Sequence, residues 1–196
     1  MAPGPAKSFD PDLALERARD LFWRRGYAGT GIRELEAELG IGRKSLYDTF
    51  GSKRELYLRS IEQYTDAVIG RICRGLADER NAALDNLERV LGKLQQHHGS
   101  NDSLGCLLGV AMAQINSDDE ELAALLRRYL RRLETAFERA LLQAQADGAV
   151  RDDVKAKDAA RQLVAITQGM ALMGRVADMR AMQRSIVRAS LQALRA

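Results

Sequence analysis

The sequence predicts an all-α protein of about nine helices, and three observations lead to this fold class. Ala, Leu, Arg, Glu and Gln, which lose little side-chain freedom in a helix, recur along all 196 residues. Of the three prolines, two lie within the first five residues, where they interrupt no helix. Apolar side chains recur every three or four residues, and no segment keeps the strict alternation that is typical of a strand.

The composition is that of a globular protein, with 46% hydrophobic and 29% charged residues. The sequence holds no apolar run of ~18 residues that could span a membrane, and its first residues lack the apolar stretch of a signal peptide. Cys73 and Cys106 show no CxxC spacing, which favours a reducing compartment over a structural disulfide. We therefore expect a cytoplasmic protein that does not associate with membranes.

The first predicted helix follows a short arm. Residues 1–9 contain Pro and Gly and show no periodicity, which predicts a flexible segment. Asp10 and Pro11 are typical of an N-cap and the first position of a helix, and Gly26 is typical of its end.

Two further short helices are predicted on either side of the Gly-Ile-Gly turn at residues 40–42. Thr30 is the expected cap of the first of them, and the second carries Leu46 and Phe50 one turn apart. Two short helices joined by a tight turn and preceded by another helix form a helix-turn-helix, whose second helix can enter a major groove of DNA.

A long fourth helix is predicted to begin at a capping box formed by Ser52 and Glu55 and to run to about residue 77. The first domain is therefore expected at residues 1–51, and a second helical domain at residues 52–196. Five more helices are predicted near residues 80–98, 104–116, 118–147, 155–178 and 180–195. The longest has a second capping-box pattern at Ser117 and Glu120.

The third predicted helix presents a polar face, because Leu46 and Phe50 occupy its inner side. Residues 40–54 contain four basic residues and one acid, Asp48, so positive charge is concentrated here. Arginine and lysine bind phosphates and guanine edges, and tyrosine donates to phosphates. The four basic residues are Arg43, Lys44, Lys53 and Arg54, and Ser45 and Tyr47 are further polar side chains of the third helix.

The same region resembles the TetR/AcrR family of transcriptional regulators. The matching residues are Phe22, Gly26, Tyr27, Thr30, Ile32, Leu35 and the continuous run from Gly40 to Lys53. The resemblance implies a homodimer that binds double-stranded operator DNA and represses transcription until a small-molecule effector releases it. The sequence departs from the family pattern at Glu36, Lys44 and Asp48, where alanine, a small residue and histidine are common.

The resemblance also implies roles for individual residues. Tyr47 and Lys53 take positions that grip phosphates, and Thr30 takes one that caps the second helix and touches the DNA backbone. The implied base-contacting region holds Arg43, Lys44 and Ser45.

The last two predicted helices resemble the surface through which family members dimerise. The candidate interface residues are Leu163, Val164, Thr167, Ala171, Met182, Ile186 and Ser190. The final helix, which is basic and has an apolar side, is also compatible with a membrane-surface helix. We favour dimerisation, because two-fold symmetry suits a regulator that binds a pseudo-palindrome.

An apolar or amphipathic effector would need a cavity within the second domain, between the fourth helix and the helix at 118–147. Methionine and aromatic side chains could line it, although at helical spacing they are also typical of an ordinary core. The candidate pocket residues are Tyr64, Cys106, Met112, Tyr129, Phe137, Met170 and Met173. Cys106 is alternatively a redox or electrophile sensor, or a buried thiol.

No enzyme class is indicated, because the sequence has no phosphate-binding glycine loop, no HExxH and no nucleophile elbow. His97 and His98 are adjacent and cannot form a metal pair on one helix face, so no metal or cofactor is expected. The alternative function is a helical adaptor without DNA activity, which would have no reason to concentrate basic residues around the third helix.

Overall fold

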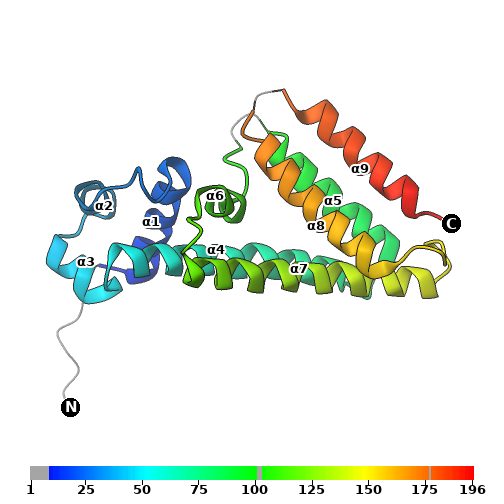
Figure 1. Cartoon of the computed structure of the whole chain (residues 1–196), viewed down its shortest axis with the longest axis horizontal. Helices are drawn as coiled ribbons and strands as arrows, with labels where there is room; N and C mark the ends of the chain where they lie inside the picture. The colour runs from blue at the N-terminus through cyan, green and yellow to red at the C-terminus, as the bar shows by residue number, and fades with distance from the viewer. Residues whose placement is uncertain (1–8, 101–102, 177) are drawn as a thin grey trace, which may run out of the picture. The chain divides into compact units, whose positions relative to one another are not determined.

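The computed structural model describes residues 9–100, 103–176 and 178–196, and nine helices lie within them (Figure 1). The predicted all-α fold is confirmed. The predicted arm lies outside the described residues except for Phe9. The chain forms two compact units, and the boundary between them falls inside the fourth helix, after Tyr64.

The N-terminal unit consists of three helices and the first part of a fourth. They are α1 (Pro11–Arg25), α2 (Ile32–Leu39), α3 (Arg43–Phe50) and the start of α4 (Lys53–Leu76). Phe22 of α1 is fully buried, and its ring meets the edge of the Tyr57 ring from α4 with centroids 5.1 Å apart. The start of α4 therefore belongs to the core of this unit, which explains why the unit extends beyond the predicted boundary at Gly51.

The helix ends of this unit follow the expected chemistry at most positions. The Asp10 carboxylate accepts the amide of Asp12 at 2.9 Å, and Gly40 ends α2 in the left-handed conformation. The predicted cap at Thr30 is wrong, because the residue at the N-cap of α2 is Gly31, whose amide donates to Glu34 at 2.7 Å. Thr30 is instead fully buried, and its hydroxyl donates to the carbonyl of Gly26 at 2.7 Å.

The C-terminal unit contains the rest of α4 and five further helices. They are α5 (Ala83–His98), α6 (Leu107–Gln114), α7 (Glu120–Ala146), α8 (Ala156–Met173) and α9 (Arg180–Leu194). Helix α5 packs against α7, α8 and α9, and α7 packs against α8 (Figure 1). Leu87, Leu91, Phe137 and Leu163 are among the buried residues of the resulting core.

Two boundaries in this unit differ from prediction for local reasons. Ser117 does not cap α7; the cap is Asp119, whose carboxylate accepts the amide of Leu122 at 3.1 Å. Helix α6 begins later than predicted, because Gly105 has a φ of 76° that helical backbone does not adopt. A Cβ at Gly105 would also lie 2.5 Å from the carbonyl oxygen of Ala171, so this close approach requires glycine.

Neither a membrane-spanning helix nor a metal-binding cluster occurs in the described ranges. No helix there is long and apolar enough to cross a membrane. No group of three or more His, Cys, Asp or Glu side chains in those ranges is arranged to hold a metal ion.

Candidate nucleic-acid interface

Helix α3 is held by two buried side chains, and four of its other six residues are exposed. Leu46 and Phe50 have exposed fractions of 0% and 3%, so they fix α3 against the N-terminal unit. The side chain of Lys44 is 91% exposed, and Tyr47 is also exposed. The structure thus brings the predicted residues Arg43, Lys44 and Tyr47 onto one accessible helix, with Ser45 half-buried beside them.

Lys44 is not an isolated cation. Its ammonium group donates to the carboxylate of Asp48 one turn later, at 2.7 Å. The hydrogen bond to Asp48 and the charge of its carboxylate raise the pKa of Lys44. Asp48 therefore offsets the charge of Lys44 on the very face that the sequence predicts to approach DNA.

Arg43 and Tyr47 form a second pair on α3. The guanidinium carbon of Arg43 lies 5.7 Å from the centre of the Tyr47 ring, within the range of a cation–π contact. This contact reduces the rotational freedom of both side chains and keeps a guanidinium beside a phenol. Such a pair can bind two neighbouring acceptors on a nucleic-acid surface.

The beginning of α4 adds a second cluster of cations, and the predicted capping box is present. The amide of Ser52 donates to Glu55 at 2.7 Å, and the amide of Glu55 donates to the Ser52 hydroxyl at 3.1 Å. This reciprocal pair fixes where α4 starts. It therefore also fixes the backbone positions from which the side chains of Lys53 and Arg54 extend.

Tyr27 supports the cations at the start of α4, a role that the sequence analysis did not assign. The Lys53 ammonium lies 4.2 Å from the centre of the Tyr27 ring, and the Arg54 guanidinium carbon lies 5.8 Å from it. Partial burial lowers the pKa of Lys53. Only the fold brings Tyr27 next to Lys53, so sequence spacing gave no signal for this contact.

Thr30 does not share this surface. Because its side chain is fully buried and its hydroxyl is bonded to the carbonyl of Gly26, it has no surface for a phosphate contact. Its observed contact instead fixes the segment between α1 and α2.

The predicted effector-pocket residues are distributed over both units. Tyr64 ends the N-terminal unit, and its ring contacts the Trp23 ring at a centroid distance of 4.8 Å. Phe137 and Met170 are buried in the core cluster of the C-terminal unit. Tyr129 is also buried there, and Cys106, Met112 and Met173 are half-buried.

The predicted dimer residues also differ in accessibility. Leu163, Thr167 and Ala171 have exposed fractions of 3% or less in the single chain, so a partner could cover almost no more of them. Val164, Ile186 and Ser190 are half-buried, and Met182 is exposed. Three large apolar residues that are exposed near the α8–α9 connection are Leu172, Val176 and Met182.

Two family profiles match this chain. Residues 14–59 match the bacterial regulatory proteins of the tetR family, and residues 83–189 match the tetracyclin repressor-like C-terminal domain. The first match covers α2, α3 and most of α1, and the second covers α5, α6, α7 and α8.

Individual relatives match over most of their length. YezE, an uncharacterized HTH-type transcriptional regulator of Bacillus subtilis (strain 168), is 33% identical over 148 residues, which are 74% of this chain and 75% of YezE. ComR, an HTH-type transcriptional repressor of Escherichia coli (strain K12), is 27% identical over 173 residues, 88% of this chain and 82% of ComR. A solved structure of a cysteine mutant of the TetR family regulator CifR, complexed with a 26-base-pair operator DNA, superposes with a TM-score of 0.83. It is 26% identical and covers 97% of this chain and 100% of the CifR chain.

Proposed function

We propose, on the premise that this chain belongs to the tetR family of bacterial regulatory proteins and is a DNA-binding transcriptional regulator, that it is a homodimeric repressor of a pseudo-palindromic operator. The predicted family and the prediction of a regulator rather than an enzyme are confirmed by the matches. Repression is supported by the relative ComR, which is named a repressor. The proposed place of action is the cytoplasm, where a bacterial chromosome lies.

One observation supports the assignment of the DNA-contacting surface. The exposed side chains of α3 lie on a helix-turn-helix, and the next helix, α4, begins with two cations. We assign Tyr47 and Lys53 to phosphate contacts, because a phenol and an ammonium group donate to phosphate oxygens without regard to base sequence. Arg43, Lys44 and Ser45 are assigned to base edges in the major groove.

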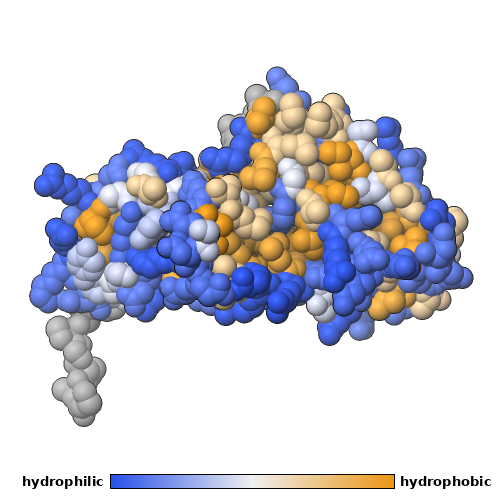
Figure 2. Space-filling view, in the orientation of Figure 1, coloured by the Kyte–Doolittle hydropathy of each residue, from blue (hydrophilic) through white to orange (hydrophobic). Residues whose placement is uncertain are grey.

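The proposed dimer places two copies of α3 in successive major grooves. Two-fold symmetry then requires half-sites with centres ~34 to 36 Å apart or a multiple of that distance. Apolar surface over α8 and α9 supports this arrangement (Figure 2). Leu172, Val176 and Met182 contribute exposed apolar side chains from the end of α8 to the start of α9, and a second copy would cover them.

Release by an effector is supported by the continuity of α4. This helix runs without interruption from Lys53, beside the DNA-contacting surface, to Leu76 in the C-terminal unit. A ligand that binds more tightly to one position of α4 than to another shifts the chain toward that position and so changes operator affinity. The size of the change is limited by the difference in ligand affinity between the two positions. A 100-fold change requires about 2.7 kcal/mol of coupling. Cys106 is half-buried at the start of α6, and release through α4 requires no reaction of its thiol.

Selection from a randomised duplex pool tests the function, with the enriched sequences measured by fluorescence anisotropy at two salt concentrations. We expect a pseudo-palindrome whose affinity falls as salt rises, and a changed base preference for Lys44→Ala. A pool without enrichment and without salt-sensitive binding would support the helical adaptor instead.

A further inference from the structure

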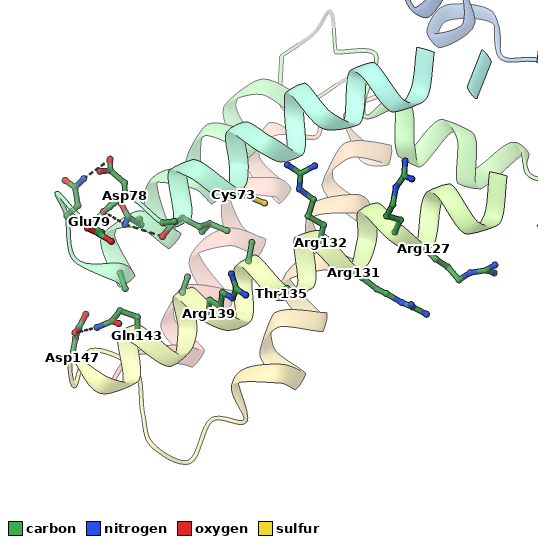
Figure 3. Close-up of a pocket in the computed structure, with 18 of the residues that line it drawn as sticks. Cys73, Asp78, Glu79, Arg127, Arg131, Arg132, Thr135, Arg139, Gln143 and Asp147 are labelled. Carbon is green, nitrogen blue, oxygen red and sulfur yellow. Dashed lines mark hydrogen bonds between the residues drawn. The ribbon is translucent and has the colours of Figure 1, made fainter. Parts of the chain in front are cut away.

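A large groove in the C-terminal unit lies along α7. It encloses about 1250 Å³ and is open to solvent (Figure 3). Cys73 and Leu76 of α4 form part of one wall, Asp78 follows in the connecting loop, and Ala83 and Asn86 come from the start of α5. The opposite wall is α7 from Ala124 to Gln143.

The wall formed by α7 is rich in arginine. Five arginines line the groove, namely Arg127, Arg128, Arg131, Arg132 and Arg139. Successive separations of four, three and four residues place Arg128, Arg132, Thr135 and Arg139 on one face of the helix. In Figure 3 the side chains of Arg127 and Arg132 point from α7 toward the side on which α4 lies.

Internal ion pairs compensate these arginines only in part. Arg132 donates to Asp66 of α4 at 2.7 Å, and Arg127 is paired with Glu120. Arg131 and Arg139 are exposed, and neither forms an ion pair with a residue in the described part of the chain. Like charges one turn apart on a helix repel one another, so this wall favours an anion beside it.

Three acidic residues also line the groove, Asp78, Glu79 and Asp147, and they lie toward the end away from Arg127 and Arg132 (Figure 3). Asp78 accepts hydrogen bonds from Arg80 at 2.8 and 3.0 Å and from Arg89 at 3.2 Å, and Arg80, with a smaller effect of Arg89, lowers the pKa of Asp78 to about 2. Asp147 accepts from Gln143 at 2.9 Å. Arg80 and Arg89 offset Asp78, and because five arginines and three acids line the groove, it keeps a surplus of positive charge.

Between these polar groups the groove has apolar walls. Leu76 and Cys73 of α4 and Ala136 and Ala140 of α7 all line it. Arginine binds carboxylate, sulfonate and phosphate groups through its planar fork of donors. A ligand that fits both features has several anionic groups on an apolar body.

We propose that this groove binds a small organic anion with at least two negative groups on an apolar body, and that this molecule is the effector. The proposed binding site depends only on the residues of the groove, whereas the effector role rests on the proposed function. Arg132 and Arg139 bind the anionic groups, and Leu76 and Ala136 contact the apolar body. Binding of the anion in the groove affects the operator-binding surface through α4, because Cys73 and Leu76 belong to the helix that starts at Lys53.

The binding test uses the fluorescent dye 8-hydroxypyrene-1,3,6-trisulfonate, which has an apolar body and several anionic groups, with the full chain and fluorescence anisotropy. We expect saturable binding that salt weakens, and at least tenfold weaker binding by Arg132→Gln/Arg139→Gln. The control Arg71→Gln/Lys93→Gln removes the same charge at exposed positions that do not line the groove, and should stay within about twofold of the original chain. Arg132→Lys/Arg139→Lys keeps the charge and should bind with intermediate affinity.

Three results would overturn the site: no saturable binding by the original chain, equal losses in the two glutamine double variants, or equally tight binding of inorganic pyrophosphate, which has no apolar body. Thermal unfolding of each variant checks that its fold is kept.

The effector role is tested separately, by adding the dye to the complex with the selected operator. We expect at least a tenfold change in operator affinity, and none in Arg132→Gln/Arg139→Gln. Dye binding without any effect on operator affinity overturns the effector role. A chain that binds the dye but selects no operator contradicts the proposed function and leaves the groove site supported.

Discussion

Lys53 lies where the capped start of α4 meets the face of Tyr27, and this contact restricts the ammonium group before DNA arrives. Replacement by alanine removes the proposed phosphate contact, so Lys53→Ala should weaken binding to operator and unrelated duplexes by similar factors. The slope of log affinity against log salt concentration should flatten by about 0.9. Anisotropy titrations over several salt concentrations measure both effects, and Lys53→Arg should keep the slope. A selective loss for operator alone would argue for a base contact instead.

Asp48 opposes the charge of α3 through its ion pair with Lys44. Asp48→Asn removes a negative charge from the DNA-contacting face and leaves Lys44 free to reach a phosphate or a base. We expect tighter binding to all duplexes at low salt and a salt slope steeper by up to about 0.9. Asp85→Asn, which makes the same charge change at an exposed position of α5, is the control and should leave affinity unaltered. Weaker binding by Asp48→Asn would indicate that Asp48 positions Lys44 productively.

His98 is a buried titratable group with an exposed fraction of 5%. Burial, together with the neighbouring His97, lowers the pKa of His98 to about 4. Unfolded His98 binds a proton below pH ~6.5, whereas folded His98 does so only near pH 4, so stability falls as the pH drops between these values. From pH 7 to pH 5 we expect the original chain to lose about 2 kcal/mol more of its unfolding free energy than His98→Gln. Urea denaturation at both pH values measures this difference, and parallel pH profiles would contradict it.

The helix ends are the structural elements that local sequence predicted best. Asp10 and the Ser52–Glu55 pair act as expected because each cap joins groups only two or three residues apart. The prediction failed where two polar residues competed for the same end, as Ser117 and Asp119 do before α7. It failed at Thr30 because burial directs the hydroxyl to Gly26, a contact that depends on how the whole segment folds.

Gly40 in the turn between α2 and α3 has a φ of 68°, and no atom lies within 4 Å of the position a Cβ would take. Backbone conformation alone therefore determines the effect of Gly40→Ala, which should destabilise the chain by about 1 to 2 kcal/mol. Gly92 also has open space but lies inside helix α5, so Gly92→Ala should stabilise by about 0.5 to 1 kcal/mol. Chemical denaturation of the two variants should give effects of opposite sign. Equal effects would show that the turn tolerates a side chain.

At the scale of the whole molecule, helical spacing predicted which faces are apolar but not what covers them. Leu163 and Leu172 lie on the same helix, yet Leu163 is buried within the chain and Leu172 is 44% exposed. A core and a dimer interface select the same residue types, so sequence periodicity could not separate them. The arginines of α7 were missed as a site for a related reason: on the sequence they resemble a solvated helix face, and only the fold sets them across a groove from α4.

The exposed apolar residues at the α8–α9 connection give the sharpest test of the proposed dimer. Leu172→Lys would place a charge in the interface of both copies and remove the burial of about half a leucine side chain from each, or about 2 kcal/mol in total. The dissociation constant of the dimer should rise at least about 30-fold.

Leu142→Lys is the matched control, because Leu142 is a leucine of α7 with an exposed fraction of 53% outside the proposed interface. Sedimentation equilibrium compares the two variants, and operator affinity should fall only for Leu172→Lys, since a single copy binds one half-site. If Leu142→Lys dissociates the dimer and Leu172→Lys does not, the two-fold axis lies beside α7. The spacing of the two α3 helices, and with it the expected operator, would then have to be derived from that surface.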